Sequence, residues 1–120
     1  MCTLHANGPK EAIKRLALMI MRSGLDIDPF LVQELICDTI DVIVTQRRLA
    51  EDGSRKIVAI TEVIGFSQGR PLVQDIVRFE KQLVDGKVLG NFKLVNPLSS
   101  KLQAKLFDHG IQAEEISCFV

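Results

Sequence analysis

The chain has 120 residues, with 15 Lys and Arg side chains against 15 Asp and Glu side chains, so its formal net charge is zero. Because the charges also balance in each half, no basic region is present to neutralise phosphates, and we expect no nucleic-acid partner. A hydrophobic share of 47% with 25% charged residues excludes a disordered chain and indicates one globular domain over residues 1–120.

Two helices are predicted in the first third of the chain. The first has Gly8 as its cap, begins at Pro9 and ends near Gly24, while the second begins at Pro29 after the N-cap Asp28. Apolar residues recur at helical spacing in both segments. They are Ile13, Leu16, Ala17 and Ile20 in the first helix, and Leu31, Val32, Leu35, Ile36 and Ile40 in the second.

The period then changes to that of strands. The β-branched run within residues 41–49 predicts a buried strand, and a turn at 51–54 joins it to a second strand over 55–66. Another turn at residues 67–69 leads to shorter strands, over 72–79 and 88–95.

A last helix is predicted from the cap Ser99 to Gly110, and the tail from Gln112 onward carries little signal. The predicted order is therefore two helices, about four largely antiparallel strands and a C-terminal helix, which is an α/β fold.

Motifs of self-contained enzymes do not occur. The sequence has no G-x-S-x-G and no H-E-x-x-H. No G-x-x-x-x-G-K-[ST] phosphate loop occurs either. Its nearest candidate, Gly86-Lys87, falls in a predicted turn ending at Gly90 and is followed by Val88, where a hydroxyl is required.

One polar segment, Thr3-Leu4-His5-Ala6-Asn7, stands directly before the first helix and is predicted to be the end of a strand. A helix N-terminus offers free amides and a partial positive charge, and the imidazole of His5 can add a hydrogen bond to an anion. Alternatively, His5 bonds to a neighbouring turn and Asn7 shapes the entry to the helix. Spacing alone favours the second interpretation.

The three cysteines, Cys2, Cys37 and Cys118, are scattered, which favours a reducing cytosol over a disulfide framework. Cys2 and His5 have the spacing of half a zinc site, but no second close pair follows. The dense apolar stretch at residues 16–21 is far shorter than the roughly 20 residues that a membrane span needs. We therefore expect no direct membrane span.

A series of motifs, taken in chain order, resembles those of the type II/IV secretion ATPases. The segment before the first helix resembles the family's histidine box, and the last motif is similar to the closing segment of CpaF/TadA-type pilus-assembly ATPases. The motifs, which together cover most of the chain, are Thr3-Leu4-His5-Ala6-Asn7-Gly8-Pro9 with Ala12, Arg15 and Leu16; Ser23-Gly24-Leu25; Asp41-Val42-Ile43-Val44 with Gln46 and Arg48; Asp52-Gly53-Ser54-Arg55-Lys56 with Ile60-Thr61-Glu62-Val63; and Gly86-Lys87-Val88-Leu89-Gly90-Asn91-Phe92 with residues 102–111.

The resemblance implies the C-terminal part of a RecA-like ATPase domain. Such proteins are cytoplasmic hexamers, peripheral to the inner membrane, that couple hydrolysis of ATP with Mg²⁺ to protein export or pilus assembly on a membrane platform. The family's P-loop and Walker B carboxylate precede the histidine box, so residues 1–120 contain neither. We expect the isolated chain to hold no cofactor and to be inactive.

The resemblance also implies roles for single residues. His5 and Arg15 are the candidate catalytic residues, with His5 near the γ-phosphate and Arg15 relaying its state or pairing with a carboxylate. Thr3, together with His5, belongs to the nucleotide-binding segment. The arginines of the hairpin, with Glu62 orienting one of them, are candidates to reach a phosphate across a subunit interface; they are Arg47, Arg48 and Arg55.

A second function stays open, that of a nucleotide-free interaction module that binds partner subunits of a secretion or pilus platform. In either case the strand at residues 41–49 would lack its neighbours from the whole domain. We therefore expect a homo-oligomer that associates through the sheet edge or the first helix.

Overall fold

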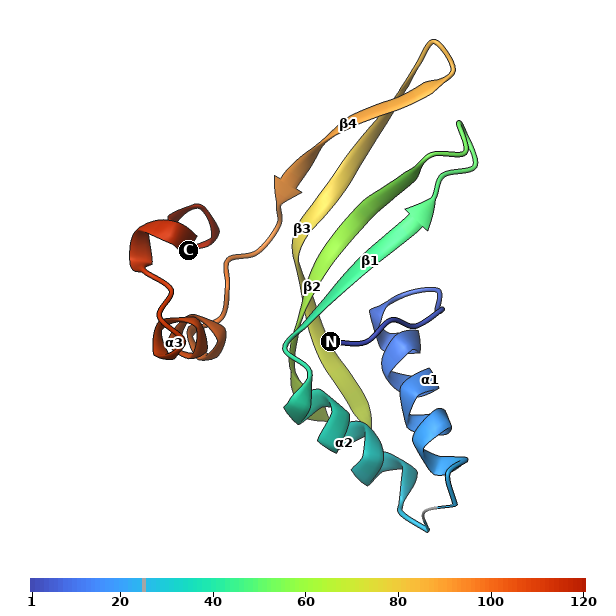
Figure 1. The fold of residues 1–120 in the computed structure, drawn as a ribbon, viewed down its shortest axis with the longest axis vertical. Helices are drawn as coiled ribbons and strands as arrows, with labels where there is room; N and C mark the ends of the chain where they lie inside the picture. Colours follow the sequence, from blue (N-terminus) through green and yellow to red (C-terminus); the bar gives the residue numbers. More distant parts are fainter. Residues whose placement is uncertain (25) are drawn as a thin grey trace. The chain divides into compact units, whose positions relative to one another are not determined.

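A computed structural model describes residues 1–24 and 26–120, in which two helices are followed along the chain by the four strands of one antiparallel sheet and then by the C-terminal helices (Figure 1). The coarse fold class predicted from the sequence is thereby confirmed. The elements are α1 (Pro9–Met21), α2 (Pro29–Thr39), β1 (Val42–Arg48), β2 (Arg55–Ser67), β3 (Arg70–Val84), β4 (Lys87–Leu94), α3 (Ser100–Asp108) and the 3₁₀ helix η1 (Ala113–Phe119). Leu25, the last position of the Ser23-Gly24-Leu25 motif, lies outside the described residues.

Both N-terminal helices begin at the prolines that predicted them. Gly8 precedes Pro9 with an extended backbone, and Asp28 caps α2 because its carboxylate accepts the N–H of Phe30 at 2.8 Å. Proline suits this position because its missing N–H would have no partner in the first turn. After α1, Gly24 takes a φ of +92°, a conformation that a side chain would strain.

The four strands pair in chain order, β1-β2-β3-β4. The turns that join β2 to β3 and β3 to β4 have two residues each, and both residues have a positive φ; they are Gln68-Gly69 and Asp85-Gly86. Turns of this kind match the twist of the strands, so the two strands stay paired up to the turn. As a result β3 is much longer than the predicted strand over 72–79. The predicted turn from Gly86 to Gly90 is wrong in extent, because Gly90 lies within β4, opposite Lys81.

The chain divides into two compact units. The first comprises residues 1–43 and 63–74, and in it α1 and α2 pack around Val63, whose N–H is bound by the carbonyl of Asp41 at 2.9 Å. The buried residues of this core are Ile13, Ala17, Val32, Ile36, Cys37 and Val63. They include four of the apolar positions predicted from helical spacing.

The second unit comprises residues 44–62 and 75–120. Its core joins Ile76 of β3 to the C-terminal segments, with Leu98, Leu102 and Ile116 as the other buried residues. The tail beyond Gln112, for which the sequence predicted nothing definite, forms η1 and is held by a hydrogen bond of 2.8 Å from the N–H of Leu98 to the carbonyl of Phe119.

Candidate functional site

The segment before α1 has no regular secondary structure from Met1 to Ala6, so the predicted strand end at Thr3 to Asn7 is wrong. A strand needs a hydrogen-bonded neighbour, and the four strands of the sheet pair with one another in chain order. Thr3 and His5 are exposed, and Gly8 is the N-cap residue before the helix.

His5 nevertheless lies beside the first two turns of α1. Four side chains of α1 at spacings of three and four residues form one face of the helix, and the preceding segment adds the imidazole. Together these groups line an open hollow of about 640 Å³, whose lining residues are His5, Ala6, Asn7, Glu11, Lys14, Arg15 and Leu18. The structure therefore places His5 and Arg15 around the same hollow, whereas Thr3 is not among its lining residues.

The electrostatics of this hollow suit an anion. Lys14 and Arg15 contribute two positive charges against the single carboxylate of Glu11, and His5 adds ring nitrogens that can donate. The start of α1 adds the partial positive charge of a helix N-terminus. A phosphate or carboxylate group of a few oxygens is the kind of ligand that such donors bind.

The predicted arginines of the hairpin belong to the second unit. Arg47 and Arg48 end β1, one residue before the predicted end at Leu49, and Arg55 begins β2 as the sequence predicted. Arg48 closes the turn between the strands, because its Nε donates to the carbonyl of Gly53 at 3.2 Å. In this structure Arg48 therefore shapes its own hairpin.

Asp52 organises the same turn. Its carboxylate accepts the hydroxyl of Ser54 at 2.6 Å and the N–H of Ser54 at 2.9 Å, and it also accepts the N–H of Val88 on β4 at 3.0 Å. These hydrogen bonds, that from the Ser54 hydroxyl foremost, lower the pKa of Asp52 from 3.8 to about 2. Lys81 of β3 pairs with the neighbouring Glu51, so the turn is fastened to the β3–β4 hairpin.

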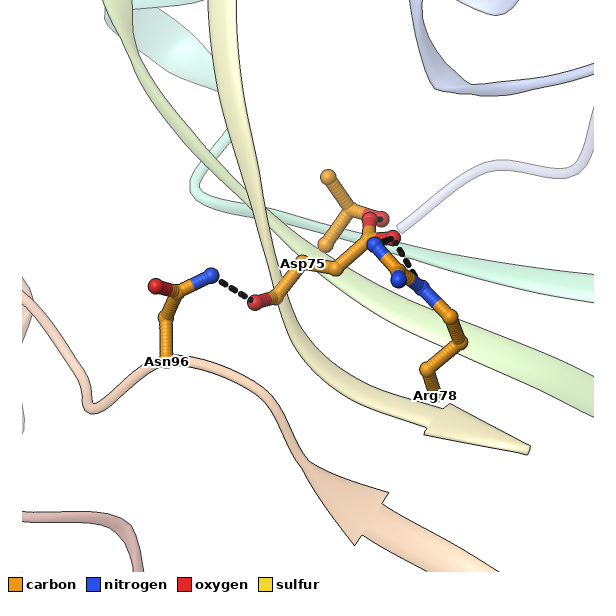
Figure 2. A network of polar contacts seen from close by, with 4 residues as sticks. Asp75, Arg78 and Asn96 are labelled. Carbon is orange, nitrogen blue, oxygen red and sulfur yellow. Dashed lines mark hydrogen bonds and ion pairs between the residues drawn. The ribbon is translucent and has the colours of Figure 1, made fainter. Parts of the chain in front are cut away.

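A polar network that the sequence did not predict surrounds Asp75 on β3 (Figure 2). The hydroxyl of the fully buried Thr61 donates to Oδ1 at 2.7 Å, and Arg78 donates from Nε and Nη2 to Oδ2 at 3.0 and 2.8 Å. Asn96 donates to the main-chain carbonyl of Asp75 at 2.8 Å. Burial raises the pKa of Asp75, but the bonds from Thr61 and Arg78 outweigh it and hold the pKa below its usual value.

Glu62, also on β2, is 3% exposed and binds the N-cap residue of α3. One carboxylate oxygen accepts the N–H of Ser99 at 3.0 Å, and the other accepts its hydroxyl. The sequence had given Glu62 the task of orienting an arginine, whereas its partner in the structure is Ser99. The only hint in the sequence was the polar pair Thr61-Glu62 within an apolar strand.

Among residues 1–24 and 26–120, no group of three or more His, Cys, Asp and Glu side chains could hold a metal ion, and the three cysteines are free thiols. None of the helices described has the length and apolar character needed to cross a bilayer.

No protein-family model matches the chain. A search of curated proteins gives no significant match either.

Proposed function

We propose that residues 1–120 are the C-terminal part of the RecA-like domain of a type II/IV secretion ATPase of the CpaF/TadA type. The proposal is supported by the ordered set of motifs in the sequence. One structural observation carries it furthest: His5 and Arg15, ten positions apart, line the same hollow at the start of α1.

In this function the hollow contributes donors to the terminal phosphate of ATP. His5 lies on the segment that leads into the helix, so its imidazole can approach a phosphate while the amides of the first turn remain available. Donors held in place before the reaction stabilise the charge that develops in the transition state. Arg15, with its charged fork, grips phosphate oxygens or pairs with a neighbouring carboxylate.

The remaining requirements lie outside this chain. A P-loop and a Walker B carboxylate hold the β- and γ-phosphates and Mg²⁺ in such ATPases. In the complete protein, a hexamer would use the arginines of the β1–β2 hairpin at subunit interfaces and would act on a secretion or pilus platform at the inner membrane. Those arginines are Arg47, Arg48 and Arg55.

An interaction module without nucleotide is the second candidate. It is favoured by the exposed apolar side chains of α2, because Phe30, Leu31 and Leu35 are 58%, 47% and 54% exposed on one helix. Exposed apolar groups gathered in this way are typical of surfaces that bind another protein.

The test compares two purified proteins, residues 1–120 and the longest chain that the same reading frame encodes. If the proposal is right, the longer chain carries a G-x-x-x-x-G-K-[ST] motif and hydrolyses ATP, while residues 1–120 give no turnover above a protein-free control. A reading frame without this motif, or a longer chain without turnover, would favour the interaction module.

A further inference from the structure

The β3–β4 hairpin carries its two phenylalanines on one face and most of its charged side chains on the other. Residues that pair across the hairpin share a face, so Phe79 and Phe92, Leu83 and Val88, and Val77 and Leu94 lie on one side. The rings of Phe79 and Phe92 are in contact, with centroids 5.3 Å apart, but Phe92 remains 59% exposed. The other face carries Lys93 and Glu80, whose charged groups are 3.4 Å apart.

Strand β4 is at one end of the sheet, so it pairs with β3 on one side and has an open edge on the other. The N–H of Val95 donates to the carbonyl of Ile76 at 2.8 Å, which fixes the direction of the backbone groups along the strand. Because these groups alternate in an antiparallel pair, those of Gly90, Phe92 and Leu94 point away from β3. An edge of this kind is a template for another strand.

Asp52 limits how far that open edge extends. The backbone groups of Val88 also point away from β3, but its N–H already donates a hydrogen bond to the carboxylate of Asp52 at 3.0 Å. The backbone groups left for another strand are therefore those of Gly90, Phe92 and Leu94, with Phe92 at the centre. Two of the three also have large apolar side chains, 59% exposed for Phe92 and 43% for Leu94.

We propose that β4 pairs antiparallel with β4 of a second copy of this chain, about a two-fold axis at Phe92. In this register Phe92 lies opposite Phe92 of the second copy, and Gly90 lies opposite Leu94. Each residue whose backbone groups point away from β3 then has a partner, and the faces that carry the phenylalanines of the two copies lie on the same side of the joined sheet. No like charges meet directly, because Lys93 lies opposite Asn91 and retains Glu80 as its counter-ion.

This pairing does not depend on the proposed function, since it uses neither the hollow at α1 nor a nucleotide. A closed, self-complementary contact is the commonest form of association between identical chains. Its product is a continuous sheet through two copies, with the bond between Asp52 and Val88 kept in each.

The oligomeric state of residues 1–120, measured by sedimentation from micromolar to hundreds of micromolar concentration, tests the proposal without any ATPase assay. We expect a concentration-dependent dimer whose dissociation constant Phe92→Glu raises about tenfold or more, since two like charges would face each other at the axis. Leu89→Glu is the matched control. Leu89 is 56% exposed, but its side chain is on the face opposite to that of Phe92, and its backbone N–H and carbonyl point toward β3. We expect this control to leave the dimer unchanged.

Cross-linking covers the case in which Phe92→Glu fails to fold. In a chain with Cys2→Ser and Cys118→Ser, we expect oxidation to link Phe92→Cys to itself, because hydrogen-bonded pairs have Cα atoms about 5.5 Å apart, within disulfide range. Leu89→Cys should give little linked product. A parent chain that stays monomeric, a dimer that Phe92→Glu leaves intact, or equal cross-linking of both cysteine variants would overturn the proposal.

Discussion

Both carboxylate oxygens of Glu62, in the middle of β2, bind Ser99, one at its main-chain N–H and the other at its hydroxyl. Ser99 in turn accepts the N–H of Leu102 and so caps α3. A strand residue thus fixes the first turn of a helix that follows 37 positions later in the chain. Because Glu62 is buried, its loss leaves the start of α3 without that support.

Replacing this carboxylate should therefore destabilise the second unit. We expect Glu62→Ala to lower the free energy of unfolding in urea by about 1–3 kcal/mol, the usual cost of removing one partner of a buried hydrogen bond. Glu34→Ala, at an exposed position of α2, is the control and should change it by less than about 0.5 kcal/mol. Equal unfolding curves for Glu62→Ala and the parent would mean that Ser99 caps α3 without help.

The turn around Asp52 should make the protein sensitive to acid. A carboxylate whose pKa is lowered in the folded chain stabilises it above the unfolded pKa, and this contribution is lost as the pH falls through the folded pKa. For Asp52, whose pKa falls from 3.8 to about 2, the stabilisation should be complete above about pH 4 and fade toward pH 2. Asp52→Asn should remove this dependence.

Unfolding in urea at several pH values between 2 and 6 checks this prediction. The difference in stability between the parent and Asp52→Asn should shrink as the pH falls from 4 to 2. Ser54→Ala removes the leading cause of the shift, so the loss in this variant should be smaller than in the parent and should end at a higher pH. A difference between parent and Asp52→Asn that is constant over the whole range would show that Asp52 is not held in this way.

Gly90 is expected to be essential to the β3–β4 hairpin. A Cβ at this position would lie 2.1 Å from the carbonyl oxygen of Glu80 and 2.9 Å from Cζ of Phe79, so the backbone itself would have to move. We expect Gly90→Ala to lower the free energy of unfolding by about 1–3 kcal/mol, the range seen for overpacking. In Gly65→Ala the new methyl group meets nothing within 4 Å, and this variant on β2 is the control. Equal effects of the two substitutions would contradict the predicted clash.

Local signals explain what the sequence predicted correctly. Pro9, and Asp28 with Pro29, mark helix starts through their own backbone and side-chain chemistry, which needs no distant partner. The β-branched run before Arg47 likewise predicted β1, but the expectation that this strand is buried is wrong, because Val42 and Val44 are 38% and 55% exposed. The sequence predicted β3 too short, because the length of β3 depends on the turn at Asp85-Gly86. This turn keeps β3 and β4 in register.

The polar contacts could not be predicted for a related reason. Thr61 meets Asp75 only because β2 and β3 are adjacent, and Glu62 meets Ser99 only because α3 packs back near β2. Nothing in the spacing of these residues encodes either contact. At the hollow, the sequence singled out His5 and Arg15, which both line it, but not Lys14, although the helical period places Lys14 on the same face.

The claim that His5 serves phosphoryl transfer is tested most directly by steady-state ATP hydrolysis in the longest chain of the same reading frame. His5→Ala is compared there with His109→Ala, because His109 is the one other histidine and its ring contacts the carbonyl of Lys105 on α3. We expect His5→Ala to lower kcat about 100-fold with little change in KM, since the contact strengthens in the transition state, and His109→Ala to match the parent. Equal kcat values for His5→Ala and the parent would contradict the account and leave His5 with a structural role only.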